Sequence, residues 1–245
     1  MTAVAELAVY PDSARLMQAA ADQIVGAAAA AVAARGRFSL ALAGGSTPAP
    51  LYRLLAAAPY AAQVDWRAVY VFWGDERCVP PQHADSNYRM ARETLLSRVP
   101  IPEQHICRIH GEDDPAQAAL AYERALYAHF GGPPRFDLAL LGMGADGHTA
   151  SLFPHTPALA ERARLAVAVY AAQRGSWRVT LTYPALNAAE QALFLVSGAD
   201  KAETLRAVLE GPRRPLELPA QGVRPDAGRL LWLADADAAA LLRRE

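Results

Sequence analysis

Short runs of apolar, β-branched and aromatic residues recur along the chain and alternate with longer stretches of helical pattern. Continuous apolar runs of this length are typical of strands that are buried on both faces of a sheet. Strands are predicted over residues 6–10, 38–43, 68–73, 136–142, 164–170, 178–183, 191–198 and 229–234. Helices are predicted between most of them, over residues 12–34, 48–58, 87–97, 115–130 and 201–209.

This alternation predicts an α/β fold with a mostly parallel or mixed sheet and helices on both of its faces. The strands between residues 164 and 198 follow one another more closely, which leaves room for an antiparallel pair. Proline-rich pieces at 98–103, 131–134 and 211–225 are typical of loops within a domain rather than linkers between domains. Residues 1–245 are therefore expected to form a single domain.

Composition narrows the possible partners. The formal net charge is −1 and no basic run is interleaved with aromatic residues, so a nucleic-acid partner is not expected. Cys78 and Cys107 stand far apart, which fits a reducing compartment better than a disulfide framework or a zinc site. The first residues do not resemble a signal peptide, and the longest apolar run, residues 24–34, is about half a membrane span. We expect a cytoplasmic protein without a membrane partner.

The end of the strand at 38–43 carries the first candidate site. Gly44 and Gly45 would let backbone N–H groups approach an anion, and Ser46 and Thr47 lead into a helix that begins at Pro48. Thr47 is the expected N-cap of that helix. The pattern suits a phosphate group, although a plain strand–turn–helix corner has the same turn chemistry. No G-K-[ST] follows, so the loop is not a P-loop.

A charged cluster follows the next strand, where Asp75, Glu76 and Arg77 stand in immediate succession. Such clusters are usually solvated, but the carboxyl ends of strands are also where α/β sheets place catalytic groups. Asp85 or Ser86 is the expected cap of the helix that comes after it.

The stretch FDLALLGMGADGHTASLFP, residues 136–154, contains the G-x-G-x-x-G spacing of a dinucleotide-binding turn at Gly142, Gly144 and Gly147. Such a turn requires a long helix after the third glycine and an acidic residue at the end of the next strand. Prolines at 154 and 157 prevent the long helix, and the next strand is followed by AAQRG. A nicotinamide oxidoreductase is therefore disfavoured.

Two protonatable groups, Asp146 and His148, flank the third glycine of that stretch. A lone histidine is more often structural than catalytic, but a histidine two residues from an aspartate in a strand-end turn favours acid–base chemistry. The six histidines include no H-E-x-x-H, and none falls in a metal-binding spacing.

Five pieces of the chain together resemble the 6-phosphogluconolactonase family: LAGGSTP, WGDERCVPPQHADSNYRMA, LLGMGADGHTASLFP, RVTLTYPALNAA and GADKAETL. The likeness covers nearly all of the chain, and the GDER and GMGADGHTASLFP pieces are its specific parts. It implies a Rossmann-like fold shared with glucosamine-6-phosphate deaminase. It also implies hydrolysis of 6-phospho-D-glucono-1,5-lactone to 6-phosphogluconate, the second step of the oxidative pentose phosphate pathway, without a metal or an organic cofactor.

The resemblance also implies residue roles. His148 is hypothesised to remove a proton from the water that attacks the lactone carbonyl and to protonate the departing ring oxygen, with Asp146 or Asp75 orienting its ring. Arg77 would lie near the developing oxyanion or a substrate hydroxyl, or form an ion pair with Asp75 or Glu76. The phosphate would be bound by the backbone at Gly44, Gly45, Ser46 and Thr47 and by the basic residues Arg178 and Lys201.

A deaminase and a sugar-phosphate sensor are the alternatives to the lactonase. Deaminases of the related family carry an aromatic residue where this chain has Arg77, and a glutamate shortly after D-G-H, where the next acid here is Glu161. A non-catalytic sugar-phosphate sensor of the same fold is a further alternative. The expected partner is a small sugar-phosphate lactone, and the expected state a monomer or a small homo-oligomer.

Overall fold

A parallel sheet of six strands lies at the centre of the computed structural model, which describes residues 5–243. Its strands are β1 (Ala5–Tyr10), β2 (Phe38–Leu42), β3 (Val69–Trp73), β5 (Leu138–Leu141), β8 (Gln191–Val196) and β9 (Arg229–Asp235). They are arranged in the order β1-β9-β8-β5-β2-β3, and every neighbouring pair is parallel. Strands β2, β5 and β8 are buried along their whole length, as their continuous apolar sequences predict.

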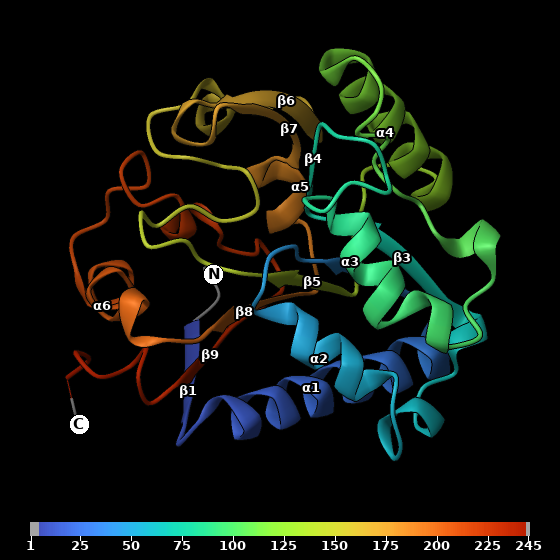
Figure 1. Cartoon of the computed structure of the whole chain (residues 1–245), viewed down its shortest axis with the longest axis horizontal. Coiled ribbons are helices and arrows are strands. Elements are labelled where there is room, and N and C mark those ends of the chain that lie inside the picture. Colours follow the sequence, from blue (N-terminus) through green and yellow to red (C-terminus); the bar gives the residue numbers. More distant parts are fainter. Residues whose placement is uncertain (1–4, 244–245) are drawn as a thin grey trace.

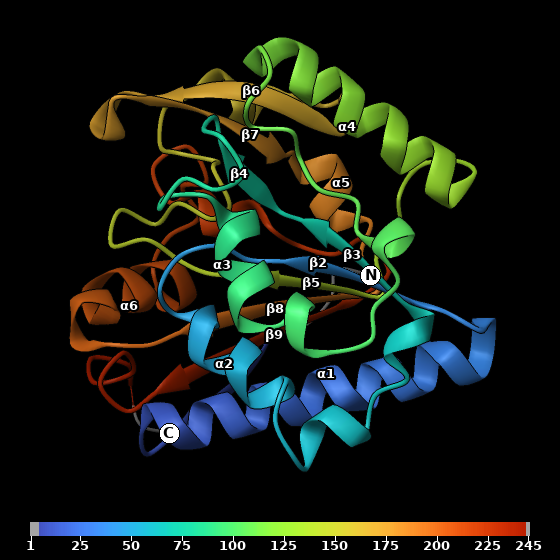
Figure 2. The ribbon, with the colours of Figure 1, turned by 45° about the vertical axis from the view of Figure 1, so that its right-hand side comes forward.

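Helices α1 (Ser13–Arg35) and α2 (Pro48–Leu55) lie on one side of this sheet (Figure 2). Helix α1 begins at the N-cap Asp12, whose side chain accepts a hydrogen bond from the Arg15 N–H, and it ends at Gly36 in the left-handed conformation. By length and composition α1 could cross a membrane, a test that core helices also pass. A stripe at helical spacing, which includes Leu16 and Ile24, is buried in the core.

A second, antiparallel sheet covers part of the opposite side of the main sheet (Figure 2). It consists of β4 (Asp75–Arg77), β7 (Ser176–Leu181) and β6 (Ala166–Ala171), in that order. The predicted antiparallel pair is therefore confirmed. Residues 75–77, for which a solvated charge cluster was the alternative to a catalytic one, form a strand of this small sheet, and Asp75 and Glu76 are buried in it.

The chain passes from one sheet to the other at Gly74. Its N–H donates to the Leu42 carbonyl of β2 (2.9 Å), and its carbonyl accepts the N–H of Leu181 in β7 (2.8 Å). One residue thus bonds to both sheets. The charged residues that follow it are placed on the small sheet rather than on the carboxyl edge of the main one.

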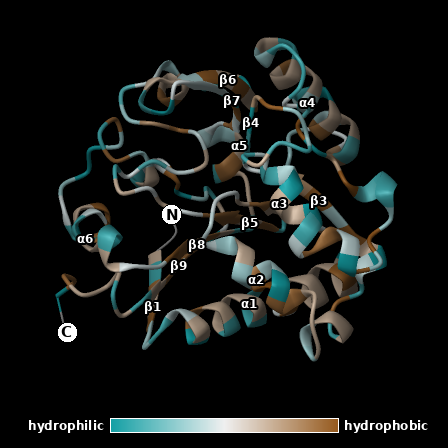
Figure 3. Ribbon diagram, viewed as in Figure 1, coloured by the Kyte–Doolittle hydropathy of each residue, from teal (hydrophilic) through white to brown (hydrophobic). Residues whose placement is uncertain are grey.

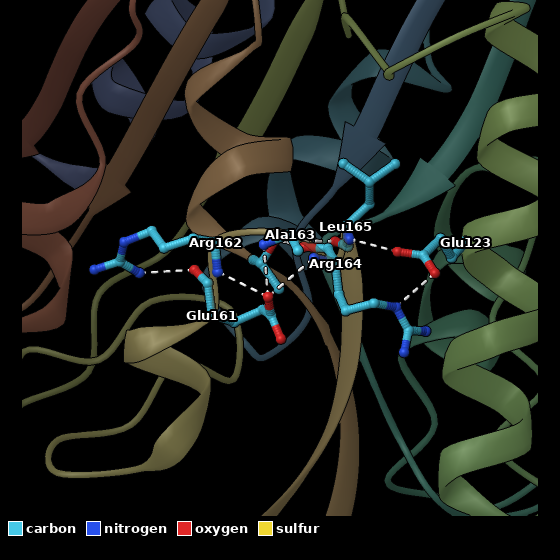
Figure 4. A network of polar contacts seen from close by, with 7 residues as sticks. Glu123, Glu161, Arg162, Ala163, Arg164 and Leu165 are labelled. Atoms are coloured by element: carbon cyan, nitrogen blue, oxygen red, sulfur yellow. Dashed lines mark hydrogen bonds and ion pairs between the residues drawn. The ribbon is translucent and has the colours of Figure 1, made fainter.

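Helix α4 (Pro115–Phe130) holds the small sheet in place. Glu123 accepts hydrogen bonds from the Arg164 Nε (2.7 Å) and from the Leu165 N–H (2.6 Å), just before β6 begins (Figure 4). The preceding residue of the helix, Tyr122, is buried, and its hydroxyl bonds to both the N–H and the carbonyl of Trp73 in β3, at 2.9 Å each. Helix α4 therefore joins the two sheets.

The remaining helices are α3 (Asn87–Thr94), α5 (Tyr183–Asn187) and α6 (Ala202–Glu210). Ser86, one of the two residues expected to cap α3, is its N-cap. The Ser86 hydroxyl accepts the Arg89 N–H at 3.1 Å. Thr47 does not cap α2: its backbone is already helical, at φ −62° and ψ −44°, so its side chain makes no capping bond. Figure 3 shows hydrophobic residues along the central strands and hydrophilic ones on the outer helices.

The strand order creates a crevice between β2 and β5. From β2 the chain crosses to β3 on one side, and from β5 it proceeds to β8 on the other side, so the loops that leave these adjacent strands diverge. In parallel sheets, ligands bind where neighbouring connections diverge in this way at the carboxyl edge. The GGSTP and GMGADGH loops follow these two strands.

Candidate active site

A cleft of about 560 Å³ opens at this edge of the main sheet. Its walls are the loops after β2, β3, β5 and β8 on one side and the small sheet on the other. Of the residues proposed from the sequence, the structure places these along the cleft: Gly44, Gly45, Ser46, Thr47, Asp75, Arg77, His148, Arg178 and Lys201. Asp146 lies directly behind His148.

Asp146 is the carboxylate that contacts the histidine. One oxygen, Oδ1, lies 2.5 Å from the His148 Nδ1 and 3.1 Å from the His148 backbone nitrogen. Burial raises the pKa of Asp146, but the hydrogen bonds and the charge of His148 outweigh it, so the pKa lies below its usual value. The imidazole packs on Phe153, with ring centroids 4.6 Å apart. No described residue hydrogen-bonds its second nitrogen, Nε2, which is left available to a substrate in the cleft.

The glycines of this loop make room for the pair. A Cβ at Gly144 would lie 2.0 Å from the His148 Nδ1, and one at Gly147 would lie 2.8 Å from a Leu218 methyl group. Gly147 also has φ +78°, in the left-handed region that favours glycine. Within the described residues no α-helix follows until α5, so the loop has none of the architecture of a dinucleotide-binding turn.

Asp75 is engaged elsewhere. Its carboxylate accepts the Ser151 hydroxyl at 2.6 Å and the Asn87 side-chain amide at 3.1 Å, and it is 8% exposed. Asn87 in turn leaves no space for a side chain at Gly44, where a Cβ would lie 1.9 Å from its amide oxygen. This network ties three cleft loops together through two residues, Asn87 and Ser151, that sequence reasoning missed.

Glu76 is structural. Its buried carboxylate accepts the backbone N–H groups of Arg77 (2.8 Å), Asn87 (2.7 Å) and Tyr88 (2.7 Å) and the Ser86 hydroxyl (3.2 Å). Burial raises its pKa, against the effect of the three N–H groups. Glu76 thereby fixes the start of α3 against β4.

Two arginines face each other across the small sheet. Arg77 of β4 is paired in register with Arg178 of β7, so both side chains lie on one face. Both Nε atoms are buried without a hydrogen-bond partner among the described residues, and Arg77 Nη1 donates to the Asp85 carbonyl at 2.6 Å. The part of the chain that is described contains no ion pair of Arg77 with Asp75 or Glu76, the alternative raised above.

Lys201 reaches the cleft from the loop after β8. Its Nζ lies 2.9 Å from the Asp200 carboxylate, and its side chain is 21% exposed. Asp235, at the end of β9, holds the preceding turn by accepting the Gly198 N–H at 3.1 Å and the Ser197 hydroxyl. The turn that carries Lys201 is thus built on the end of the neighbouring strand.

A further cation, Arg174, lines the cleft from the tip of the β6–β7 hairpin. Sequence reasoning missed it, since a single arginine in a turn carries no recognisable signal. Within residues 5–243 no group of three histidine, cysteine or acidic side chains could hold a metal ion.

Comparison with known proteins agrees with this arrangement. Residues 11–232 match the family described as glucosamine-6-phosphate isomerases/6-phosphogluconolactonase. The chain belongs to this family. Relatives named 6-phosphogluconolactonase include one from Nostoc, 44% identical over 96% of this chain and 97% of the relative, and one from Mycobacterium tuberculosis, 43% identical over the same shares.

Solved structures of the family superpose closely. A 6-phosphogluconolactonase from Trypanosoma cruzi has a TM-score of 0.89 at 30% identity, with 100% of this chain and 99% of that chain covered. A monomeric glucosamine-6-phosphate deaminase has a TM-score of 0.82 at 22% identity, over 96% of this chain and 99% of that chain, which establishes a shared fold alone. The α/β fold inferred from the sequence, related to that of the deaminase, is confirmed.

Proposed function

We propose that the chain hydrolyses 6-phospho-D-glucono-1,5-lactone to 6-phospho-D-gluconate, the second step of the oxidative pentose phosphate pathway. Its relatives named 6-phosphogluconolactonase match it over almost their whole length. The observation that carries the proposal is the His148–Asp146 pair, at 2.5 Å, in a cleft lined by basic side chains. A base beside several cations suits an anionic substrate that is attacked by water.

The geometry supports a base-catalysed attack. His148 Nε2 takes a proton from water as the water oxygen forms a bond to the lactone carbonyl carbon, and Asp146 stabilises the imidazolium through Nδ1. When the tetrahedral intermediate collapses, the bond to the ring oxygen breaks. The imidazolium returns the proton to that oxygen, which becomes the free hydroxyl of the product.

The positive charges in the cleft are suited to stabilise the oxyanion and to bind the phosphate. Arg77 supplies a cation for the oxyanion that develops on the carbonyl oxygen. The phosphate is bound by backbone N–H groups of the loop at Gly44 and Gly45, continued by Ser46 and Thr47, and by Arg178 and Lys201. The left-handed Gly45, at φ +89°, gives this loop the open backbone that such an approach requires.

The deaminase alternative lacks a second acid beside the histidine. Glu161, the first acid after the D-G-H turn, accepts the backbone N–H groups of Arg162, Ala163 and Arg164 at 2.6–3.0 Å, so it caps its own turn (Figure 4). It does not line the cleft. A chemistry that opens a pyranose ring and moves a C2 proton needs such a group.

The test is formation of 6-phosphogluconate from freshly prepared lactone, followed by a coupled dehydrogenase and corrected for spontaneous hydrolysis. We expect turnover far above the background. Release of ammonia from glucosamine 6-phosphate would instead indicate the deaminase, and binding of 6-phosphogluconate without acceleration would indicate a sensor.

We also expect a monomer or a small homo-oligomer in the cytoplasm, acting on a small sugar phosphate with no nucleic-acid or membrane partner. Light scattering after size exclusion measures the oligomeric state directly.

A further inference from the structure

The tip of the β6–β7 hairpin has a defined geometry beside the cleft. Ala171 and Ser176 are the last paired residues of the two strands. Between them, a 3-10 turn over Ala172–Arg174 closes on Gly175, which has φ 60° and donates its N–H to the Ala172 carbonyl at 3.3 Å. Gly175 reverses the chain, so that Arg174 and Ser176 both lie along the cleft.

Arg174 adds a third positive charge to the small-sheet wall. Burial lowers the pKa of Arg178, the charge of Arg77 lowers it further, and the charge of Arg174 acts in the same direction. Arg174 itself is exposed and has no hydrogen bond or ion pair with any residue in the described part of the chain. Like charges gathered on one surface are unfavourable unless an anion joins them.

The acidic residues nearby offset only part of this charge. The charges of Asp75 and Asp85 raise the pKa of Arg178. The Asp75 carboxylate is held by hydrogen bonds from Ser151 and Asn87, and Asp85 presents its carbonyl to Arg77. On the opposite wall, by contrast, Lys201 is paired with Asp200 at 2.9 Å. Within the described residues, the three arginines of the small-sheet wall thus have no direct ion-pair partner.

We propose that Arg174 is a further substrate-binding residue, which contacts the phosphate group of the bound lactone together with Arg178 and makes the enzyme select phosphorylated over unphosphorylated lactones. This rests on the proposed function. The phosphate is the only charged group of that substrate, so an exposed cation at the cleft gains binding energy from it alone. A phosphate carries a charge of about −1.5 to −2 at pH 7, and an arginine fork can bond two of its oxygens.

The experiment compares two substrates on matched variants. Arg174→Gln removes the charge, Arg174→Lys keeps it, and Arg124→Gln removes an exposed arginine from α4, away from the cleft. Background-corrected rates are measured with 6-phosphogluconolactone and with glucono-1,5-lactone at low salt. We expect Arg174→Gln to lower kcat/KM about 10-fold for the phosphorylated lactone, chiefly through KM, and to change it less than about 2-fold for the other. Arg174→Lys recovers part of the loss, and added salt reduces it.

Two results would overturn the inference. One is an unchanged KM of Arg174→Gln for the phosphorylated lactone, and the other is an equal loss on both lactones, since that indicates a role in shaping the hairpin. Failure of the proposed function would look different, because the wild type would then not exceed the background. In that case calorimetry with 6-phosphogluconate decides the inference: weaker binding to Arg174→Gln than to wild type supports it, and equal or absent binding rejects it.

Discussion

The two walls of the cleft are built from sheets of different kinds. On the main-sheet wall, functional groups stand on loops that leave the carboxyl ends of parallel strands, and they include the His148–Asp146 pair. On the small-sheet wall, arginine side chains project from antiparallel strands and from their connecting turn. Loops can place one reactive group in an unusual backbone setting, as Gly144 and Gly147 allow here. Paired strands instead repeat side chains on one face, which suits a surface of like charge.

Groups that act on the reacting atoms and groups that bind the phosphate are expected to change different kinetic constants. A group that acts only on the reacting atoms changes kcat, whereas a group that binds the distant phosphate equally in the ground and transition states changes KM. Substitutions at the His148–Asp146 pair of the main-sheet wall should therefore act mainly on kcat, and those at the residues proposed to bind the phosphate, Arg178 of the small-sheet wall among them, mainly on KM.

The largest effect is expected from His148→Ala. Loss of the base should lower background-corrected kcat by about 10²- to 10⁴-fold. The melting temperature should change little, because the ring is partly exposed and its one described hydrogen-bond partner is the Asp146 carboxylate. His110→Ala, which removes an exposed histidine outside the cleft, is the control. Full activity of His148→Ala would contradict the mechanism.

Gly144→Ala tests whether the loop is shaped for the histidine. The added Cβ would lie 2.0 Å from Nδ1 and 2.6 Å from the Asp146 carboxylate, so the pair must move. A misplacement of about 1 Å in a catalytic group can cost roughly 100-fold, and we expect a loss of that order in kcat with a smaller change in KM. Gly132→Ala, where no atom lies within 4 Å, should leave both constants unchanged.

The two cations proposed to bind the phosphate should differ. Arg178→Gln removes a charge that has no direct ion-pair partner among the described residues, whereas Lys201→Gln removes one that Asp200 already balances in part. We expect KM to rise about 10-fold for Arg178→Gln and about 3-fold for Lys201→Gln, with kcat changed less in both. Initial rates over a range of lactone concentration measure both constants. A larger rise for Lys201→Gln would show that Lys201 is the stronger of the two phosphate contacts.

The smallest effect is expected at His129, where α4 packs on the main sheet away from the cleft. His129 of α4 packs on Phe72 of β3, at 4.9 Å between ring centroids, and its Nε2 lies 3.4 Å from the Ser39 hydroxyl of β2. Burial lowers the pKa of His129 to about 4, with smaller contributions in the same direction from the charges of Arg37 and His105. In the unfolded chain the imidazole of His129 binds a proton near pH 6.5, whereas in the folded protein it binds one only near pH 4. The neutral His129 therefore contributes fully to the free energy of unfolding above about pH 6.5.

The pH dependence of stability follows from that sign. As pH falls from about 6.5 towards 4, the unfolded state gains a proton that the folded state does not bind, and the melting temperature should decline. His129→Gln should flatten this part of the curve relative to the wild type, as followed by calorimetry. Identical slopes in the two proteins would show that His129 is not the group responsible.

The main-sheet wall could be foreseen from the sequence more fully than the other. Continuous apolar runs located its strands, and the rule that ligands gather at strand ends singled out the loops at 44–47 and 142–148. The choice between Asp75 and Asp146 could not be made, because both lie close to the right loops. Only the fold shows that Ser151 and Asn87 occupy the carboxylate of Asp75.

The small-sheet wall depends on contacts between distant segments. Strand β4 has three residues, too few for any periodic pattern, and it forms because β7 pairs with it from the far side of the sequence. Arg77 and Arg178 were proposed through the family resemblance, but their position opposite each other was not foreseen. Arg174 could be recognised as a cleft residue only from the position of the hairpin, since nothing in the local sequence distinguishes it from other surface arginines.

The pairing of β1 with β9 has a consequence for the order in which the sheet can form. Ala5 lies opposite Leu230, and among the described residues β9 is the one strand that pairs with β1 (Figure 1). These two strands are far apart in the sequence, so their pairing closes a long loop and is expected to be slow. Strands β2 and β3, which follow each other closely along the chain, can pair earlier. Addition of β1 is therefore expected to be a late step in the assembly of the main sheet.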